Sequence, residues 1–417
     1  MLARDIEVKD ASSKKHIGKE TMKTSAWKIS AAAALVAVTS WTTMASAEEV
    51  KIGIIASITG PFSIWGKEYQ EGIDLFMDKV GGKAGNNTMT IIYRDVGGQN
   101  PPRSRQLAQE LVLRDKVAVL GGHELTPNVL AVTDVINQAK IPFVIFNTGT
   151  AIVTDKSPFF VRPTFTNWTT FYTVGRYAGM QGEKKCVTVT ADYAPGQDAA
   201  IAATEGLKRE GGEVVASIKV PLDATDFSSY LQRVKDASAQ CAIVFIPQGP
   251  MSVAFVKAYI DRGLLKDGIK FFGQSETDET DLPSIGDGAI GMYTSMPYQP
   301  SLDNPENKAF LAAYTKKYGA DHSPPTNITV AAYDGMQVIA KMAETVNGPI
   351  DGAKEVEAVK GMKWLSPRGP VSIDPVTREM VQNVYIREVV KEDGVLYNKV
   401  IYTFPNQGEP WHETQKK

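Results

Sequence analysis

The sequence is poor in cysteine and histidine, and after its first fifty residues it has no long hydrophobic run. Its 417 residues include two cysteines and four histidines. Two cysteines are too few for a disulfide scaffold, and they lack the spacing of a zinc site. Four histidines argue against a histidine-based metal or acid–base site. No stretch after residue 47 approaches 18 consecutive apolar residues, so no membrane-spanning helix is predicted there.

An excess of charge of one sign is also missing. The chain has 45 Lys and Arg against 47 Asp and Glu, a net charge of −2, and no basic tract in its body. This balance argues against a nucleic acid or an anionic membrane as partner.

Familiar catalytic and nucleotide-binding motifs do not occur in the positions where they function. No G-x-G-x-x-G follows a predicted strand, and neither G-x-x-x-x-G-K-[ST] nor G-x-S-x-G occurs. His123-Glu124 begins like the zinc motif H-E-x-x-H, but Pro127 stands where the second histidine belongs. We therefore expect no metal, no cofactor, no catalytic residue and no enzymatic activity. Paired-carboxylate catalysis is the one catalytic alternative that the sequence leaves open.

The N-terminal region has the pattern of a secretory signal peptide at residues 22–47. Lys23 and Lys28 form the positive region, Ala31–Val38 the apolar region, and Ala45–Ala47 an A-x-A cleavage site. Residues 1–21 precede a complete signal, and we interpret them as an over-early start assignment. The mature chain would begin at Glu48 with 38 basic and 43 acidic residues, a net charge of −5.

Beyond this signal, short apolar strands alternate with amphipathic helices, the pattern of a parallel α/β sheet. In a first βα run the helix over Gly66–Gly82 has apolar residues at intervals of three and four. The predicted strands there are Val50–Ser57, the run MTIIYRDVG, Val117–Gly121 and Ile141–Asn147. Helices are predicted at Arg103–Arg114 and Thr126–Gln138.

The pattern then restarts, so we predict two doubly wound α/β lobes. The second run has predicted strands at Cys186–Asp192, EVVASIKVP, Cys241–Pro247, Ile269–Ser275 and Ala289–Met296. Two further helices are predicted near Asn307–Tyr318 and Thr326–Val346. Val371–Thr377 and a closing hairpin of Val381–Val390 and Val395–Tyr402 complete the chain.

Polar residues follow three strands of the first run where those strands end. They are the segments Ser57–Gly66, Gly121–Pro127 and Asn147–Thr150. In open α/β sheets ligands bind at this edge, beside helix N-termini. Thr126 has the position of an N-cap with Pro127 first in the helix, and such a helix start suits a carboxylate. Plain helix capping and tight turns remain the alternative.

Several segments, in order, resemble the type I periplasmic binding proteins of the branched-chain amino-acid uptake family. KIGIIASITGPFSIWGKEYQEGIDL has the Gly-Pro pair, the Trp-Gly four residues later and the glycine six after that. ADYAPGQDAAIAATEGLKREGGEVVASIKVPLDATDFSSYLQRVKDASAQCAIVF is similar to the second lobe, and GDGAIGMYTSMPY and AAYDGMQVIA to later segments. The resemblance covers Val50–Tyr402.

The resemblance implies two lobes joined by three crossovers that close on a solute like a hinged trap. We expect crossovers near Pro163–Trp168, Met296–Pro300 and Ile373–Thr377. Lobe I would hold residues 48–166 and 299–372, and lobe II residues 167–298 and 373–417. The implied role is delivery of an amino acid or small carboxylate to an ABC-type permease by a periplasmic monomer.

The resemblance also assigns the ends of the ligand. In amino-acid binders a hydroxyl at the third helix and the loop after the fourth strand hold the carboxylate, here Thr126 and Thr148-Gly149-Thr150. An acidic residue after a second-lobe strand holds the ammonium group, and Glu276 is our choice. A solvated loop carboxylate is the alternative for Glu276.

Aromatic and amide residues complete the predicted site. Trp65 matches an aromatic that lines the side-chain pocket, with packing on the lobe surface as the alternative. Tyr193 would close over the ligand, or pack on its own lobe. Gln248 and Trp168 are weaker candidates, near a strand end and a crossover.

Two departures from the family bear on the solute. His123 and Glu124 stand where amino-acid binders commonly have a serine-rich run, and Pro195 replaces an aromatic before the glycine of the lobe II loop. The family also includes binders of aromatic acids, amides and urea. The carboxylate interpretation is therefore favoured over the amino-acid interpretation, and a ligand sensor that acts on a receptor is a further alternative.

The two cysteines, Cys186 and Cys241, each open a predicted strand of lobe II. If those strands are neighbours, as a 2-1-3 order requires, a disulfide is conceivable in an oxidising compartment. Because adjacent parallel strands strain the disulfide geometry, we expect two buried thiols instead.

Overall fold

The computed structural model of the chain describes residues 47–414. The predicted signal peptide, residues 22–47, lies almost wholly outside the described residues. The described residues, 47–414, lie in one compact unit. None of the helices between residues 47 and 414 combines the length and the apolar character that crossing a membrane requires.

The first lobe is built on a six-stranded sheet with the order β2-β3-β1-β4-β5-β6. All pairs are parallel except the β2–β3 hairpin at the edge. Its strands are β1 (Glu49–Ala56), β2 (Lys83–Ala84), β3 (Asn87–Asp95), β4 (Val119–Gly122), β5 (Phe143–Ile145) and β6 (Phe160–Val161). This is the doubly wound order that the βα alternation predicts, since each crossover is right-handed.

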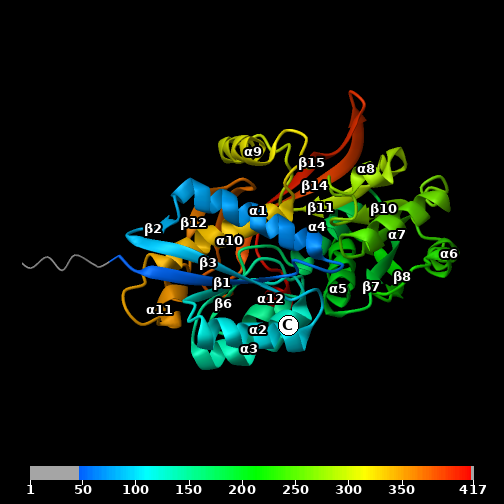
Figure 1. Cartoon of the computed structure of the whole chain (residues 1–417). Helices are drawn as coiled ribbons and strands as arrows, with labels where there is room; N and C mark the ends of the chain where they lie inside the picture. The colour runs from blue at the N-terminus through cyan, green and yellow to red at the C-terminus, as the bar shows by residue number, and fades with distance from the viewer. Residues whose placement is uncertain (1–46, 415–417) are drawn as a thin grey trace, which may run out of the picture. The chain divides into compact units, whose positions relative to one another are not determined.

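Helices cover both faces of this sheet, as a parallel sheet requires. One apolar cluster joins the sheet to α1 (Ser63–Val80) and α10 (Asn327–Ala343), and a second joins it to α2 (Pro101–Gln109) and α3 (Thr126–Ala139). Figure 1 shows α1 and α10 side by side. Gly72 permits this contact, because a Cβ there would lie 2.1 Å from the carbonyl oxygen of Thr329. The lobe also contains α9 (Pro305–Tyr318) and α11 (Gly352–Glu357).

The second sheet has nine strands in the order β12-β13-β14-β11-β10-β9-β7-β8, with β15 paired to β14. The strands from β8 to β11 are parallel, and the rest are antiparallel. Their bounds are β7 (Lys185–Ala191), β8 (Glu213–Val220), β9 (Cys241–Phe245), β10 (Lys270–Gly273), β11 (Tyr293–Met296), β12 (Lys363–Ser366), β13 (Gly369–Ile373), β14 (Met380–Glu392) and β15 (Val395–Gln407). The predicted closing hairpin is therefore present as β14–β15.

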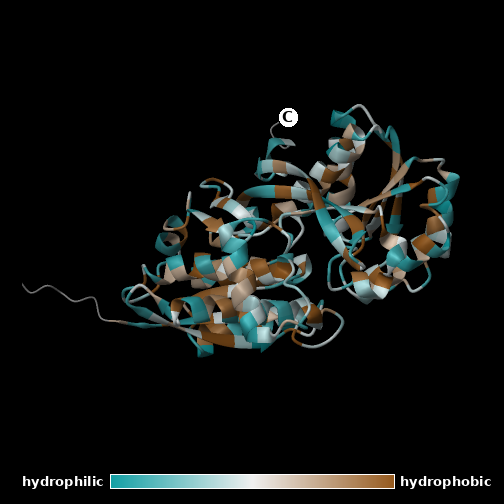
Figure 2. Cartoon of the chain, turned by 90° about the horizontal axis from the view of Figure 1, so that it is seen from above, coloured by the Kyte–Doolittle hydropathy of each residue, from teal (hydrophilic) through white to brown (hydrophobic). Residues whose placement is uncertain are grey.

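Helices also cover both faces of the parallel part of this sheet. One cluster contains apolar residues of α4 (Asn167–Met180) and α5 (Ala194–Arg209), and the other contains those of α6 (Ser228–Asp236) and α7 (Pro250–Asp261). The short helices α8 (Leu282–Ile285) and α12 (Trp411–Thr414) complete the described chain. The hydropathy colouring in Figure 2 shows hydrophobic residues concentrated on the strands and the sheet-facing sides of these helices.

Three segments connect the two sets of elements, residues 162–166, 297–304 and 374–379, near the three predicted crossovers. The predicted lobe boundary at residue 372 stays a prediction. β12 and β13, which it assigns to lobe I, hydrogen-bond into the second sheet through Ser372 and Ile373.

Two predicted details of lobe II are wrong. The strand expected from Ala289 begins only at Tyr293, because residues 287–289 form a 3-10 turn. The cysteines are not free thiols, since Cys186 and Cys241 form a disulfide. They are direct register partners on the adjacent strands β7 and β9, and their Cα atoms are 4.6 Å apart, within the range that a disulfide spans.

Candidate functional site

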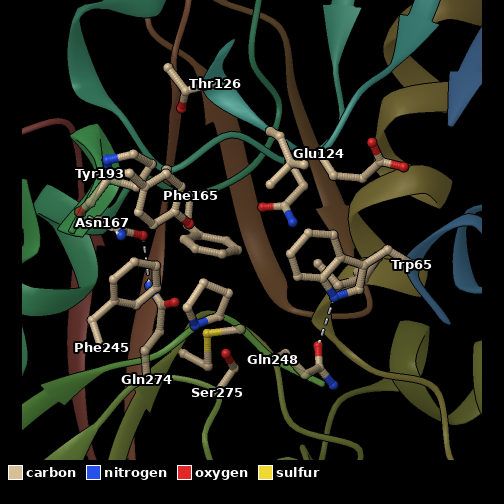
Figure 3. Close-up of a pocket in the computed structure, with 17 residues that line it drawn as sticks. Trp65, Glu124, Thr126, Phe165, Asn167, Tyr193, Phe245, Gln248, Gln274 and Ser275 are labelled. Atoms are coloured by element: carbon tan, nitrogen blue, oxygen red, sulfur yellow. Dashed lines mark hydrogen bonds between the residues drawn. The ribbon is translucent and has the colours of Figure 1, made fainter. Parts of the chain in front are cut away.

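A cavity of about 490 Å³, part of it open to solvent, lies where the carboxyl ends of both sheets meet. Its lining comes from loops that follow strands of both sheets, from the first crossover and from the first turns of several helices, as the close-up in Figure 3 shows. Among the described residues that line it, none is Lys, Arg or His.

Aromatic rings form two opposite walls of the cavity. Trp65 of α1 stacks on Phe62, with ring centroids 4.8 Å apart. Tyr193, before α5, stacks on Phe245 at the end of β9, with centroids 6.1 Å apart. Phe165 of the first crossover adds a further ring. The two aromatic residues predicted from the sequence, Trp65 and Tyr193, therefore lie on facing walls of the cavity. The space between their rings suits a flat apolar group.

One hydrogen bond joins the two lobes beside the cavity. The indole Nε1 of Trp65 donates to the side-chain oxygen of Gln248, at 3.3 Å. The side-chain nitrogen of Gln248 in turn donates to the hydroxyl of Thr280, at 3.1 Å. Figure 3 shows Gln248 beside Trp65, with this bond as a dashed line. Gln248, a weak candidate by sequence, is therefore a cavity residue that links both lobes.

Uncharged hydrogen-bond donors from the first lobe lie at one end of the cavity. Thr126 lines the cavity, and its hydroxyl donates to that of Thr150 at 3.0 Å. Thr126 is not the N-cap that its sequence position suggested. It is the first residue of α3, and the N-cap is Leu125, which has no side-chain capping bond. Pro127 has no N–H, and the amides of Asn128 and Val129 donate to the carbonyl of Leu125, so the Thr126 amide is the group of this first turn that is suited to a carboxylate oxygen.

The loop after β5 supplies a backbone surface next to Thr126. Gly149 lines the cavity, whereas Thr148 and Thr150 lie behind it. The Thr148 hydroxyl bonds to the carbonyl of Asn147, so it is used within the loop. Gly149 has no room for a side chain, because a Cβ there would lie 2.7 Å from the side-chain oxygen of Asn167.

The second lobe supplies a further group of polar side chains. The side-chain nitrogen of Gln274 donates to the hydroxyl of Thr170 at 2.6 Å and to the side-chain oxygen of Asn167 at 3.2 Å. Ser275 follows it in the lining. Sequence reasoning missed Gln274, Ser275 and Asn167, although the strand-end rule pointed to this stretch of the chain.

Glu276 does not have the position that we expected. It is not among the cavity-lining residues, and its side chain is completely buried. One carboxylate oxygen accepts the amide of Ile246 and the other the amide of Gln274. These bonds tie the loops after β9 and β10 together, so this carboxylate is not available to a ligand ammonium group.

Of the other residues considered in the sequence analysis, two line the cavity and two lie outside its lining. Glu124 and Pro195 line the cavity. One oxygen of Glu124 accepts the Ser57 amide, and burial raises the pKa of this side chain to about 7. His123 is buried behind the lining, where burial lowers its pKa to about 3 and keeps it neutral. Trp168 is also buried outside the lining.

Stability is expected to fall as the pH rises from 5.5 to 8.0. Burial raises the pKa of Glu124, Glu276 and Asp281 to about 7, and that of Glu409 to about 8. The native state therefore holds protons that the unfolded chain has released above its ordinary carboxyl pKa values, and this stabilisation is lost as the pH passes through the folded values. Urea unfolding at both pH values should show a loss of about 2 kcal/mol or more.

The matched control is Glu124→Gln, which removes one ionisation and should flatten the slope. Its second carboxylate oxygen has no hydrogen-bond partner within residues 47–414, so the amide replaces no contact there. An unfolding free energy that is flat or rises between these pH values would contradict the prediction.

No cluster of His, Cys, Asp and Glu within residues 47–414 has the arrangement of a metal site. The cavity combines stacked aromatic walls, neutral hydrogen-bond donors from the first lobe, and amide and hydroxyl side chains from the second. It has the composition of a binding site for a small, flat, polar molecule.

A model of the periplasmic binding protein family matches residues 49–394. The chain belongs to this family, in the type I group of the branched-chain amino-acid binding proteins. Members of this class are the solute-binding proteins of ABC transporters, which bind small molecules outside the cytoplasm and work with membrane permease subunits. They are not an enzyme family.

Two kinds of relative stand out. The chain is 46% identical over 375 residues to a Leu/Ile/Val-binding protein homolog of Brucella melitensis, covering 89% of this chain and 95% of that protein. It is also similar to an ABC-transporter solute-binding protein from R. palustris in complex with 4-hydroxybenzoate, at 43% identity and a TM-score of 0.84, covering 88% of this chain and all of that one. A Rhodopseudomonas palustris BisB5 protein in complex with 3,4-dihydroxybenzoic acid is 40% identical, with a TM-score of 0.82 and coverage of 87% and 99%.

Proposed function

We propose that this protein captures an aromatic carboxylate, a hydroxylated benzoate in particular, and delivers it as a periplasmic monomer to an ABC permease for import. The observation that carries the proposal is the cavity itself. Its walls are aromatic and its first-sheet end offers neutral hydrogen-bond donors. Glu124, the one carboxyl among the described residues that line it, accepts the Ser57 amide, and burial raises its pKa to about 7.

The amino-acid interpretation fails at the ammonium end of the ligand. Glu276 already accepts two backbone amides, and one oxygen of Glu124 accepts the Ser57 amide. The other oxygen of Glu124 is shielded from solvent. Because burial raises the pKa of Glu124 to about 7, this carboxyl is only partly ionised near neutral pH and is an incomplete counter-charge for a desolvated α-ammonium group. A benzoate brings no such group.

In the proposed pose the ligand carboxylate lies at Thr126 and Gly149. The ring lies between Trp65 and Tyr193, and a ring hydroxyl reaches Ser275 and its neighbours in lobe II. Because the two ends of such a ligand contact different lobes, its binding energy favours the closed arrangement over the open one. The aromatic-acid complexes of the R. palustris proteins support this choice of ligand class.

A thermal-shift screen of the purified chain that begins at Glu48 tests the proposal. The probes are 4-hydroxybenzoate, 3,4-dihydroxybenzoate, benzoate, leucine and urea, each at about 1 mM. A ligand at 100 times its Kd adds about 2.7 kcal/mol of stability, which a melting curve resolves easily. We expect a shift with the benzoates and none with leucine or urea.

A shift with leucine alone would overturn the aromatic proposal. The import role has its own test, because a strain that lacks this protein should lose uptake of micromolar 4-hydroxybenzoate. Unchanged uptake in that strain, with tight binding in vitro, would instead favour a sensing role.

A further inference from the structure

A buried arginine lies directly behind the loop that forms the carboxylate end of the cavity. Arg162, in the first crossover, is 0% exposed. One terminal nitrogen of its guanidinium donates to the carbonyls of Thr148 (2.7 Å) and Thr150 (2.6 Å), and the other to that of Ala151 (3.0 Å). Sequence analysis gave no signal for this residue, because an arginine five residues before α4 belongs to no motif.

The same guanidinium is anchored to the third crossover. Its Nε donates to one oxygen of Glu379 at 2.7 Å, and a terminal nitrogen donates to the other at 2.6 Å. The Thr154 hydroxyl donates to this carboxylate as well. Burial lowers the pKa of Arg162, but the charge and hydrogen bonds of Glu379 and the charges of Glu409 and Asp198 together raise it, so the side chain is a cation.

This arrangement orients the loop toward a ligand. In a trans peptide the carbonyl and the following amide point in opposite directions. Because Arg162 holds the carbonyl of Thr148, the amide of Gly149 points away from the guanidinium, and no described residue accepts a hydrogen bond from it. Gly149 lies in the cavity lining, so its amide is available to a bound anion.

We propose that Arg162 is the residue that makes the cavity selective for a carboxylate over its neutral carboxamide. Arg162 does not touch the ligand. It holds the 148–151 loop so that peptide N–H groups face the cavity, and its bond to Glu379 ties that loop to the third crossover. This inference rests on the proposed carboxylate ligand, and the role that it assigns to Arg162 is one of positioning.

A second buried arginine, Arg368, makes a matched comparison possible. Arg368 is also 0% exposed and pairs with Asp334 at 2.9 Å, but it makes no hydrogen bond to the 148–151 loop. Breaking either buried pair is strongly destabilising, so Arg162→Met and Arg368→Met should lower the melting temperature alike. Only Arg162→Met should change the choice between ligands.

The experiment is calorimetric titration of the chain from Glu48 with 4-hydroxybenzoate and 4-hydroxybenzamide at pH 7.5. Hydrogen bonds to a charged group are stronger than those to a neutral one, and their loss corresponds to about 10- to 100-fold in Kd. Arg162→Met should weaken the carboxylate by this factor and the carboxamide by less than about threefold. Arg162→Lys should lie between, and Arg368→Met should keep the wild-type ratio.

A folded Arg162→Met that keeps the wild-type ratio, or a loss that is equal for both ligands, would overturn the inference. If Arg162→Met does not fold, Glu379→Gln decides, because it loosens the guanidinium but keeps the cation, and it should shift the ratio in the same direction. If the wild type binds no benzoate, the proposed function fails by itself. In that case the titration is repeated with the carboxylate that the thermal-shift screen identifies and with its carboxamide. A wild type that binds no carboxylate more tightly than its carboxamide would overturn both the proposed function and the role of Arg162.

Discussion

Replacing Trp65 with alanine is expected to weaken binding of 4-hydroxybenzoate by about 2–4 kcal/mol, or roughly 30- to 1000-fold in Kd. The indole forms one wall of the cavity and stacks on Phe62, so its removal takes away the ring contact and leaves a void. It also removes the hydrogen bond to Gln248, which links the lobes. Titration of both proteins with the same ligand measures the effect.

Two variants separate these contributions. Trp65→Phe keeps a ring but has no N–H, so it should recover most of the stacking and lose only the link to Gln248. Trp364→Ala removes another tryptophan, whose Nε1 donates to Asp334 away from the cavity. It should lower the melting temperature and leave the Kd unchanged. Wild-type affinity in Trp65→Ala would mean that the ligand lies elsewhere.

Removing the disulfide is expected to lower the free energy of unfolding by about 4 kcal/mol. Cys186 and Cys241 close a loop across a sequence separation of 55 residues, and the entropy of an unfolded chain with that crosslink gives this magnitude. The double variant Cys186→Ala/Cys241→Ala should show the loss in urea unfolding, and the wild type should approach it in the presence of a reductant.

Ligand affinity is the control for this prediction. The disulfide joins the amino-terminal ends of β7 and β9, whereas Pro247 and Gln248 follow the carboxyl end of β9. The Kd of the double variant should therefore equal that of the wild type. If the double variant were as stable as the wild type measured without reductant, the prediction that the disulfide stabilises the protein would be wrong. Its formation agrees with an oxidising, extracytoplasmic compartment.

Most secondary-structure elements were predictable because their signals are local. The helix over Gly66–Gly82 and the observed α1 differ by three residues at the start and two at the end, and the hairpin was placed within a few residues. β12 and α11 were missed, because each is short and half-exposed, and a run of four to six residues carries little periodicity.

The candidate site was predictable only in part, because the sequence shows which residues follow strand ends but not which of them bond within the protein. Trp65, Thr126, Gly149, Tyr193 and Gln248 line the cavity as expected from their place near strand ends, and their role in binding stays a prediction. Glu276 occupies such a place too, but its neighbours Ile246 and Gln274 offer two amides that its carboxylate satisfies. Nothing in the order of residues distinguishes a carboxylate that binds the backbone from one that faces a ligand.

The sequence by itself determined the two-lobed α/β fold, the family and the edge of the sheets where the cavity lies. These properties follow from hydrophobic periodicity, strand-end chemistry and motif order, which neighbours along the chain define. Only the tertiary structure decided which side chains remain free for a ligand. It also paired Cys186 with Cys241 and brought Arg162 beside Glu379, 217 residues later in the chain. Such long-range contacts are set by strand register and crossover packing, which no local pattern of residues encodes.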